Sequence, residues 1–149
     1  MTHRAETVMV AFTTAVTGLT TTGANVERDR AYDLGASKAA ALSVFMGGDD
    51  PLSDDQQSHP YLDSWLTINI DAYVKQASTA AVSTTLNKIR AEITAAIMGD
   101  YTLGQAFVLD VSEDGADPPE IGIGETPVAR QRITWRFKYR RLNTNAETS

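Results

Sequence analysis

The segment 129–141, ARQRITWRFKYRR, constrains the fold more than any other part of this chain. Apolar and charged residues alternate along it, and successive side chains of a β-strand point to opposite faces of a sheet. The apolar set is Ile133, Trp135, Phe137 and Tyr139. The basic set on the other face is Arg132, Arg136, Lys138 and Arg140. The segment therefore predicts a strand whose aromatic face packs in a core and whose basic face is solvated or covered by a partner.

A second alternating segment, WLTINIDAYV at 65–74, predicts another long strand, with an apolar face running from Leu66 to Val74. Trp65 and Tyr73 lie on the opposite face, among polar residues. Outward aromatic residues are enriched at protein interfaces. A flank of the helix layer or a long loop of the same chain could also cover them, and the sequence leaves both interpretations open.

Two segments have the three- and four-residue apolar spacing of amphipathic helices. The first is 3–17, for which Thr2 is a candidate N-cap and Gly18 a stop signal. The second is 79–98, which Gly99 terminates. Its apolar stripe consists of Val82, Leu86, Ile89, Ile93 and Ile97.

Shorter strands are predicted at 24–34, 41–47 and 105–112. Segments rich in Gly, Pro and acidic residues, 47–63 and 113–127, are predicted to be loops. The resulting order is α-β-β-β-α-β-β. Strand runs separated by single helices indicate an α+β fold, with a mostly antiparallel sheet and both helices packed on one face.

The chain has 149 residues, of which 42% are hydrophobic, and this suits one globular domain. We assign the domain to 1–142 and expect the polar tail, 143–149, to be disordered. No apolar run approaches the roughly 20 residues needed to span a bilayer, so no membrane partner is expected.

Charge is distributed unevenly along the sequence. The net charge is −6, and residues 1–129 hold 7 Lys/Arg against 18 Asp/Glu. Residues 130–149 hold 6 Lys/Arg against one Glu. This asymmetry indicates an electrostatic role, either toward nucleic acid or toward another copy of the chain.

Signatures of enzymatic and metal chemistry are absent from the sequence. Cysteine is missing, and His3 and His59 have no partners at metal-ligating spacing. The acidic pairs Asp49, Asp50 and Asp54, Asp55 lack the spacing of a calcium loop. GIGET at 122–126 fits neither a dinucleotide fingerprint nor a P-loop. We therefore expect no enzyme, no cofactor and no bound metal.

The order of short phrases along the chain resembles the tail terminator proteins of long-tailed bacteriophages. The first helix ends near TGL, a charged strand follows, and ALSVFMG leads into an acidic loop. The second helix contains LNKIRAEITAAIMGD and is followed by TLG, a strand ending in DV, and the closing ITWRFKYRR. The resemblance covers about 25–142 and rests on element order and loop placement.

The resemblance implies a small α+β virion protein, assembled in the host cytoplasm, that forms a ring, in this family a hexamer. The ring would cap the head-proximal end of the tail tube, stop its polymerisation and dock the head connector. DNA would pass through the lumen without specific binding. A head–tail connector or neck protein is the alternative in the same class, and a small nucleic-acid-binding protein using the basic strand is the alternative in another.

A ring of identical subunits uses a head-to-tail interface between two different patches. The sequence offers such a pair in the basic face of 130–140 and the acidic segments 49–63 and 113–125. The competing hypothesis is that the basic residues pair within the chain, with carboxylates on adjacent strands. The carboxylates considered for this are Glu27, Asp29, Asp71 and Asp110.

Overall fold

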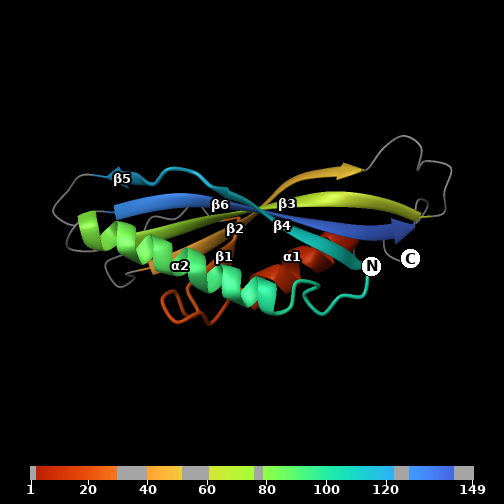
Figure 1. Cartoon of the computed structure of the whole chain (residues 1–149), viewed down its shortest axis with the longest axis horizontal. Coiled ribbons are helices and arrows are strands. Elements are labelled where there is room, and N and C mark those ends of the chain that lie inside the picture. The colour runs from red at the N-terminus through yellow and green to blue at the C-terminus, as the bar shows by residue number, and fades with distance from the viewer. Residues whose placement is uncertain (1–2, 30–39, 52–60, 76–78, 123–127, 143–149) are drawn as a thin grey trace.

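The computed structural model describes the chain in five stretches, which contain two helices and a six-stranded sheet (Figure 1). The described residues are 3–29, 40–51, 61–75, 79–122 and 128–142. The elements are α1 (Arg4–Ala15), β1 (Val26–Arg28), β2 (Ala40–Pro51), β3 (Tyr61–Lys75), α2 (Thr79–Gly99), β4 (Val108–Ala116), β5 (Glu120–Gly122) and β6 (Val128–Leu142). The predicted α+β class and element order are confirmed, and β5 is an additional short strand.

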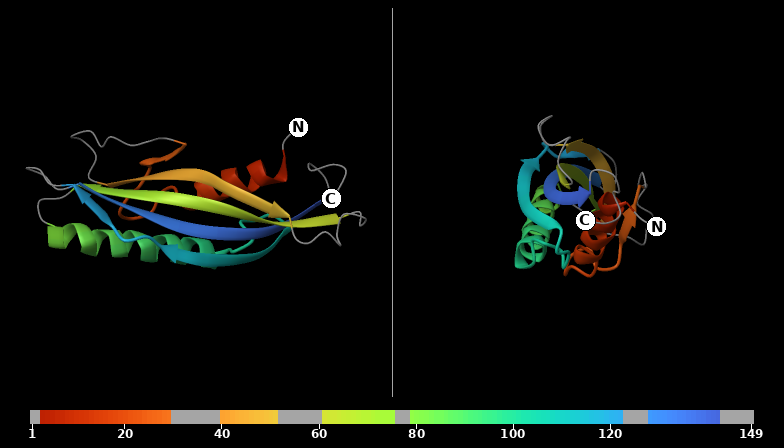
Figure 2. Two further views of the ribbon diagram at one scale, coloured as in Figure 1. Left: turned by 90° about the horizontal axis from the view of Figure 1, so that it is seen from above. Right: turned by 90° about the vertical axis from the view of Figure 1, so that its right-hand side faces the viewer.

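The sheet has the strand order β1-β2-β3-β6-β4, and β5 also pairs with β6. The β1–β2 pair is parallel and all the other pairs are antiparallel. The long strands β3 and β6 pair along their whole length, from Tyr61 opposite Leu142 to Lys75 opposite Val128. Both helices cover one face of this elongated, twisted sheet (Figure 2).

The core lies between the helices and the sheet, as the two periodicities predict. Every residue of the predicted α2 stripe is at most 1% exposed, and so is every residue of the aromatic face of β6. Phe12 of α1 meets Phe137 edge-on, with 5.6 Å between the ring centroids. The same core takes in the inward residues of β3, including Leu66, Ile68 and Ile70.

The predicted loop at 47–63 is wrong at both of its ends. Residues 47–51 continue β2 and residues 61–63 begin β3. A register shift between Met46 and Asp49 accommodates the two glycines as a bulge. Hydrogen bonding to β3 thus overrides the low strand propensity of this segment. Asp49 and Asp50 therefore lie in a strand, whereas Asp54 and Asp55 lie outside the described residues.

Other predicted boundaries also need correction. The strand predicted at 24–34 ends at Arg28, because Asp29 adopts a positive φ of 56°; 30–34 lies outside the described residues. The strand predicted at 105–112 is instead Val108–Ala116, and it runs into the predicted loop 113–127 through a second register shift. The helix cap is His3 rather than Thr2, since the Nδ1 atom of His3 accepts a hydrogen bond from the Ala5 amide at 3.0 Å.

Candidate functional site on the polar face of the sheet

The sheet face opposite the helices, here called the polar face, carries the basic residues of β6. Because β6 lies between β3 and β4, each basic residue has cross-strand neighbours on that face. Arg132 is opposite Asp71, and Arg140 is opposite Asp63. Lys138 lies between Trp65 of β3 and Asp110 of β4. The register therefore brings the predicted basic residues and Trp65 together on one surface.

Arg132 and Asp71 form a two-pronged ion pair near the middle of the polar face. The Nε and Nη2 atoms of Arg132 donate to the two carboxylate oxygens of Asp71 at 2.8 and 3.1 Å. The Asp71 side chain is only 2% exposed, whereas that of Arg132 is 41% exposed. The hydrogen bonds to Asp71 raise the pKa of Arg132. The pair fixes the guanidinium in one orientation beside the ring of Phe45, at 5.8 Å from its centroid.

Arg140 is held in the same way near one end of the sheet. Its Nε and Nη2 atoms donate to Asp63 at 2.8 and 3.2 Å, and these bonds raise the pKa of Arg140. The guanidinium lies 5.8 Å from the ring centroid of Tyr61. The two arginines are thus oriented by carboxylates of the same strand, β3.

Arg136 and Lys138 are held more loosely. Arg136 lies 3.7 Å from a carboxylate oxygen of Asp114 and 5.0 Å from the ring centroid of Trp65. Within the described part of the chain, Lys138 forms no ion pair. Among Arg132, Arg136, Lys138 and Arg140, its ammonium group is therefore the cation most available to an outside carboxylate.

Pairing within the chain is thus confirmed for Arg132 with Asp71. Arg136 and Arg140 pair with Asp114 and Asp63, which are not among the four carboxylates predicted from the sequence. The sequence predicts loops at Asp63 and Asp114, whereas both residues lie in strands. Had β3 been predicted to begin at Tyr61 and β4 to end at Ala116, both carboxylates would have been predicted to lie beside β6.

The two aromatic residues predicted on the outward face differ in their surroundings. Tyr73 is 7% exposed and is already covered within the chain. Its hydroxyl group is hydrogen-bonded to Arg130, which raises the pKa of that arginine. Trp65 is partly buried beneath Arg136. An interface role for Trp65 and Tyr73 stays a prediction.

The predicted acidic residues do not share one surface. Asp50 is exposed and lies opposite Trp65 on the polar face. Asp49 lies opposite Leu66, on the helix side, because the bulge shifts the alternation. There the Tyr139 hydroxyl group donates a hydrogen bond to the Asp49 Oδ2 atom at 2.6 Å. Asp49 thus contributes to the edge of the core rather than to an acidic loop.

This contact predicts a loss of stability at high pH. Burial and the Asp49 carboxylate raise the pKa of Tyr139, whereas the unfolded phenol loses its proton near pH 10. Above about pH 10 the folded chain therefore binds more protons than the unfolded chain. The free energy of unfolding keeps the whole contribution of Tyr139 below that pH and decreases as the pH rises above it. Tyr139→Phe should flatten this fall in urea unfolding between pH 8 and 11.

The matched control is Tyr101→Phe, at a tyrosine that is 46% exposed. It is expected to keep the wild-type pH dependence. Identical slopes for Tyr139→Phe and the wild type would contradict the assignment to Tyr139.

The described residues contain no cluster suited to a metal ion. No group of three or more His, Asp or Glu side chains among them could hold a metal ion. His3 is engaged as a helix cap, and His59 lies outside the described residues. None of the helices in this part of the chain is long and apolar enough to cross a membrane. The polar face instead presents oriented arginines beside aromatic rings.

Comparison with known proteins relates the chain to a virus-like particle at the level of the fold. No family model matches the sequence, and no curated protein matches it. Among solved structures, a chain from the virion of a native gene transfer agent particle matches with a TM-score of 0.51. The two chains are 12% identical over 92% of this chain and 90% of that one. The chain therefore shares the fold of a virion component along nearly its whole length.

Proposed function

We propose that this chain is a structural protein of a phage-like virion. The observation that carries the proposal is the likeness in fold to a chain of a gene transfer agent virion over 92% of this chain. The polar face supports the proposal, because carboxylates hold Arg132 and Arg140 in fixed orientations. Side chains fixed before association lose little further entropy when a partner binds.

Within this class we propose the role of tail terminator. A ring of subunits would cap the head-proximal end of the tail tube, stop its polymerisation and dock the head connector. The element order and loop placement that resemble tail terminators support this role. A head–tail connector or neck protein is the alternative in the same class.

A protein partner fits the polar face better than a nucleic acid does. Phosphate binding needs unpaired positive charge, and Arg132 and Arg140 already make two hydrogen bonds each to carboxylates. These carboxylates neutralise part of the positive charge of the polar face, which weakens its attraction for phosphate. We therefore propose that DNA passes the ring without specific binding.

The test of the proposed function is the mass of the purified chain by light scattering, with negative-stain images, followed by antibody labelling of particles. A ring near six times 16.1 kDa and label at the head–tail junction are expected. Label confined to the capsid shell, or no label on particles, would contradict the terminator role. Tight retention of DNA on filters at low salt would favour the nucleic-acid-binding alternative.

Charge reversal on the polar face should prevent ring formation. Arg136→Glu combined with Lys138→Glu places like charges against an acidic partner surface, which costs several kcal/mol at an interface. We expect assembly to weaken on the order of a hundredfold, with an unchanged circular dichroism spectrum of the monomer.

A matched pair of single variants tests the position rather than the charge. Lys138→Glu should weaken assembly, whereas Lys88→Glu, at an exposed position of α2, should not. Rings that form normally from the double variant would exclude this surface as the subunit contact.

A further inference from the structure

A hollow opens at one end of the molecule, separate from the middle of the polar face. Its volume is about 390 Å³. Arg4 of α1, Tyr61 of β3 and Arg140 of β6 contribute to its lining, together with Ala106, Phe107 and Leu109. Tyr61 is 45% exposed and Leu109 is 38% exposed. The hollow, here called the end pocket, thus combines two cations with exposed apolar surface.

The two arginines of the end pocket differ in how their charge is compensated. Arg140 is paired with Asp63. Arg4 forms no ion pair within the described part of the chain, and its Nε atom is buried without a hydrogen-bond partner. Its Nη1 atom donates to the Arg140 carbonyl oxygen at 2.8 Å, and its guanidinium lies 4.2 Å from the ring centroid of Phe107. Burial lowers the pKa of Arg4, and no nearby carboxylate among the described residues offsets this effect.

A partly desolvated cation of this kind is stabilised by an outside carboxylate. The exposed rings and side chains beside it favour an apolar group next to that carboxylate. The occupant that fits is therefore a peptide segment in which a carboxylate residue is followed directly by small apolar residues.

The chain itself presents such a segment, 117–120, with the sequence DPPE. Glu120, with 73% of its side chain accessible, is exposed at the edge of the sheet but already pairs with Arg130 at 3.1 Å. Asp117 is exposed and forms no ion pair with any described residue, although its charge helps to raise the pKa of Arg132. The segment is anchored at its start, because the Asp117 amide donates to the Arg132 carbonyl oxygen at 2.8 Å. It therefore offers a carboxylate and two proline rings in a fixed position.

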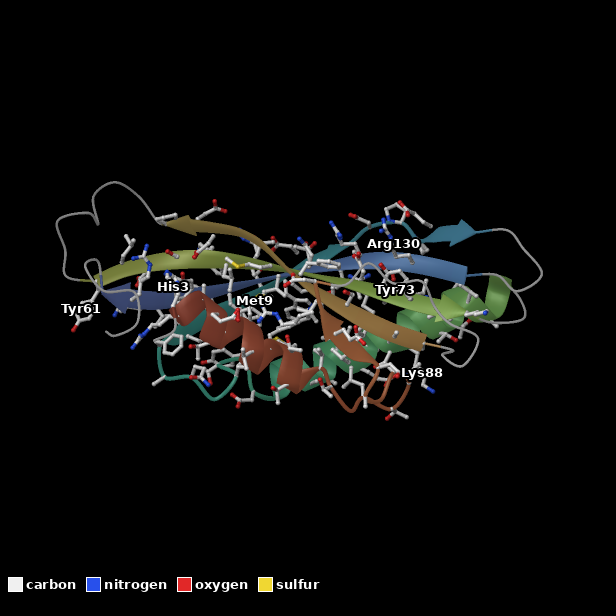
Figure 3. The ribbon with its side chains drawn as sticks, turned by 180° about the vertical axis from the view of Figure 1, so that it is seen from behind. His3, Met9, Tyr61, Tyr73, Lys88 and Arg130 are labelled. Atoms are coloured by element: carbon white, nitrogen blue, oxygen red, sulfur yellow. The ribbon has the colours of Figure 1, made fainter. Side chains whose placement is uncertain are left out.

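One molecule cannot place its own 117–120 segment in its own end pocket. The two sites lie toward opposite ends of β6, as the labels of Tyr61 and Arg130 show in Figure 3. Arg132, which holds Asp117, is eight residues from Arg140, a separation of about 27 Å along a strand. The occupant must therefore come from a second molecule.

We propose that the end pocket receives the 117–120 segment of a second copy of this chain, with Asp117 paired to Arg4 and the prolines packed on Tyr61 and Phe107. Two different patches at opposite ends make a head-to-tail contact, which repeats into a ring or a filament. The inference deepens the proposed function, on which it rests for the expectation of a repeating assembly.

The test is a charge swap measured by sedimentation of the full chain over a range of concentrations. Arg4→Glu and Asp117→Arg should each weaken self-association at least about tenfold. Combining both substitutions in one chain should recover most of it, because the contact then again joins one carboxylate to one guanidinium, with the two charges exchanged. Lys88→Glu is the matched control and should leave self-association unchanged.

A second measurement does not depend on the folding of the Arg4 variant. The peptide GADPPEIG, residues 115–122, is added to the labelled full chain, and amide signals are followed by NMR. Shifts at Phe107 and Leu109 are expected, and GANPPQIG, which lacks both carboxylates, should produce much smaller ones.

Several outcomes would overturn the inference. These are a wild-type chain that stays monomeric at every concentration, single variants that associate normally, and a combined variant that fails to recover. Shifts at Phe107 and Leu109 on deleting 143–149, without competition by the peptide, would assign the pocket to the tail of the same chain. Any of these results leaves the virion role to be judged separately by antibody labelling of particles.

Discussion

Phe137→Ala is expected to reduce the free energy of unfolding by about 3–5 kcal/mol, the usual cost of removing a buried phenylalanine side chain. Phe137 is fully buried at the centre of β6 and contacts Phe12 of α1 edge-on. Its removal would leave a cavity between α1 and the sheet and would also abolish the aromatic pair. Urea unfolding followed by circular dichroism measures the loss.

The neighbouring residue provides the control for this variant. Arg136→Ala changes the next position of the same strand, but on the polar face. Its ion pair with Asp114 is long, at 3.7 Å, and both side chains are about one-third exposed. Such a pair contributes about 0–1 kcal/mol. Comparable losses for the two variants would contradict the assignment of the two faces.

The sequence predicts the two faces of β6 correctly because the alternation of side chains is a local property. Each of its buried aromatic residues follows from period two alone. The α2 stripe is predicted for the same reason, since its spacing matches one helix face. The buried face of such a segment can be predicted without knowing which elements pack against it.

Partners across strands could not be predicted as well, because they depend on register. Asp63 pairs with Arg140 across 77 positions of sequence. Its surroundings in the sequence, rich in Gly, Pro and Asp, indicate a loop, yet β3 extends to Tyr61 because β6 is equally long and supplies its hydrogen bonds. The strand length is thus set by the partner strand.

At Asp49, a β-bulge makes the prediction from strict alternation of side chains wrong. Met46 lies opposite Ile68 and Asp49 lies opposite Leu66, so three steps in β2 match two in β3. Simple alternation from Met46 places Asp49 on the polar face, whereas the extra residue turns it toward Tyr139. Gly47 and Gly48 are the signal in the sequence that could have indicated the bulge.

Asp71→Asn should produce the second large effect, a loss of about 1.5–3 kcal/mol in the free energy of unfolding. The substitution keeps the size of the side chain but replaces one of the two acceptor oxygens of a carboxylate that is 2% exposed. Arg132 then loses one of its hydrogen bonds and the opposite charge. The loss stays below the cost of a fully buried pair because Arg132, 41% exposed, can be hydrated again.

The control for this variant is Asp114→Asn, at the exposed carboxylate beside Arg136. It should change stability by no more than about 1 kcal/mol, because exposed ion pairs are weak. A double-mutant cycle between Asp71→Asn and Arg132→Gln measures the interaction energy between the two side chains. It separates that energy from the cost of burying the Asp71 carboxylate. A coupling near zero would show that Arg132 is not held by Asp71 in solution. The polar face would then lack one of the two fixed arginines that support its proposed use in assembly.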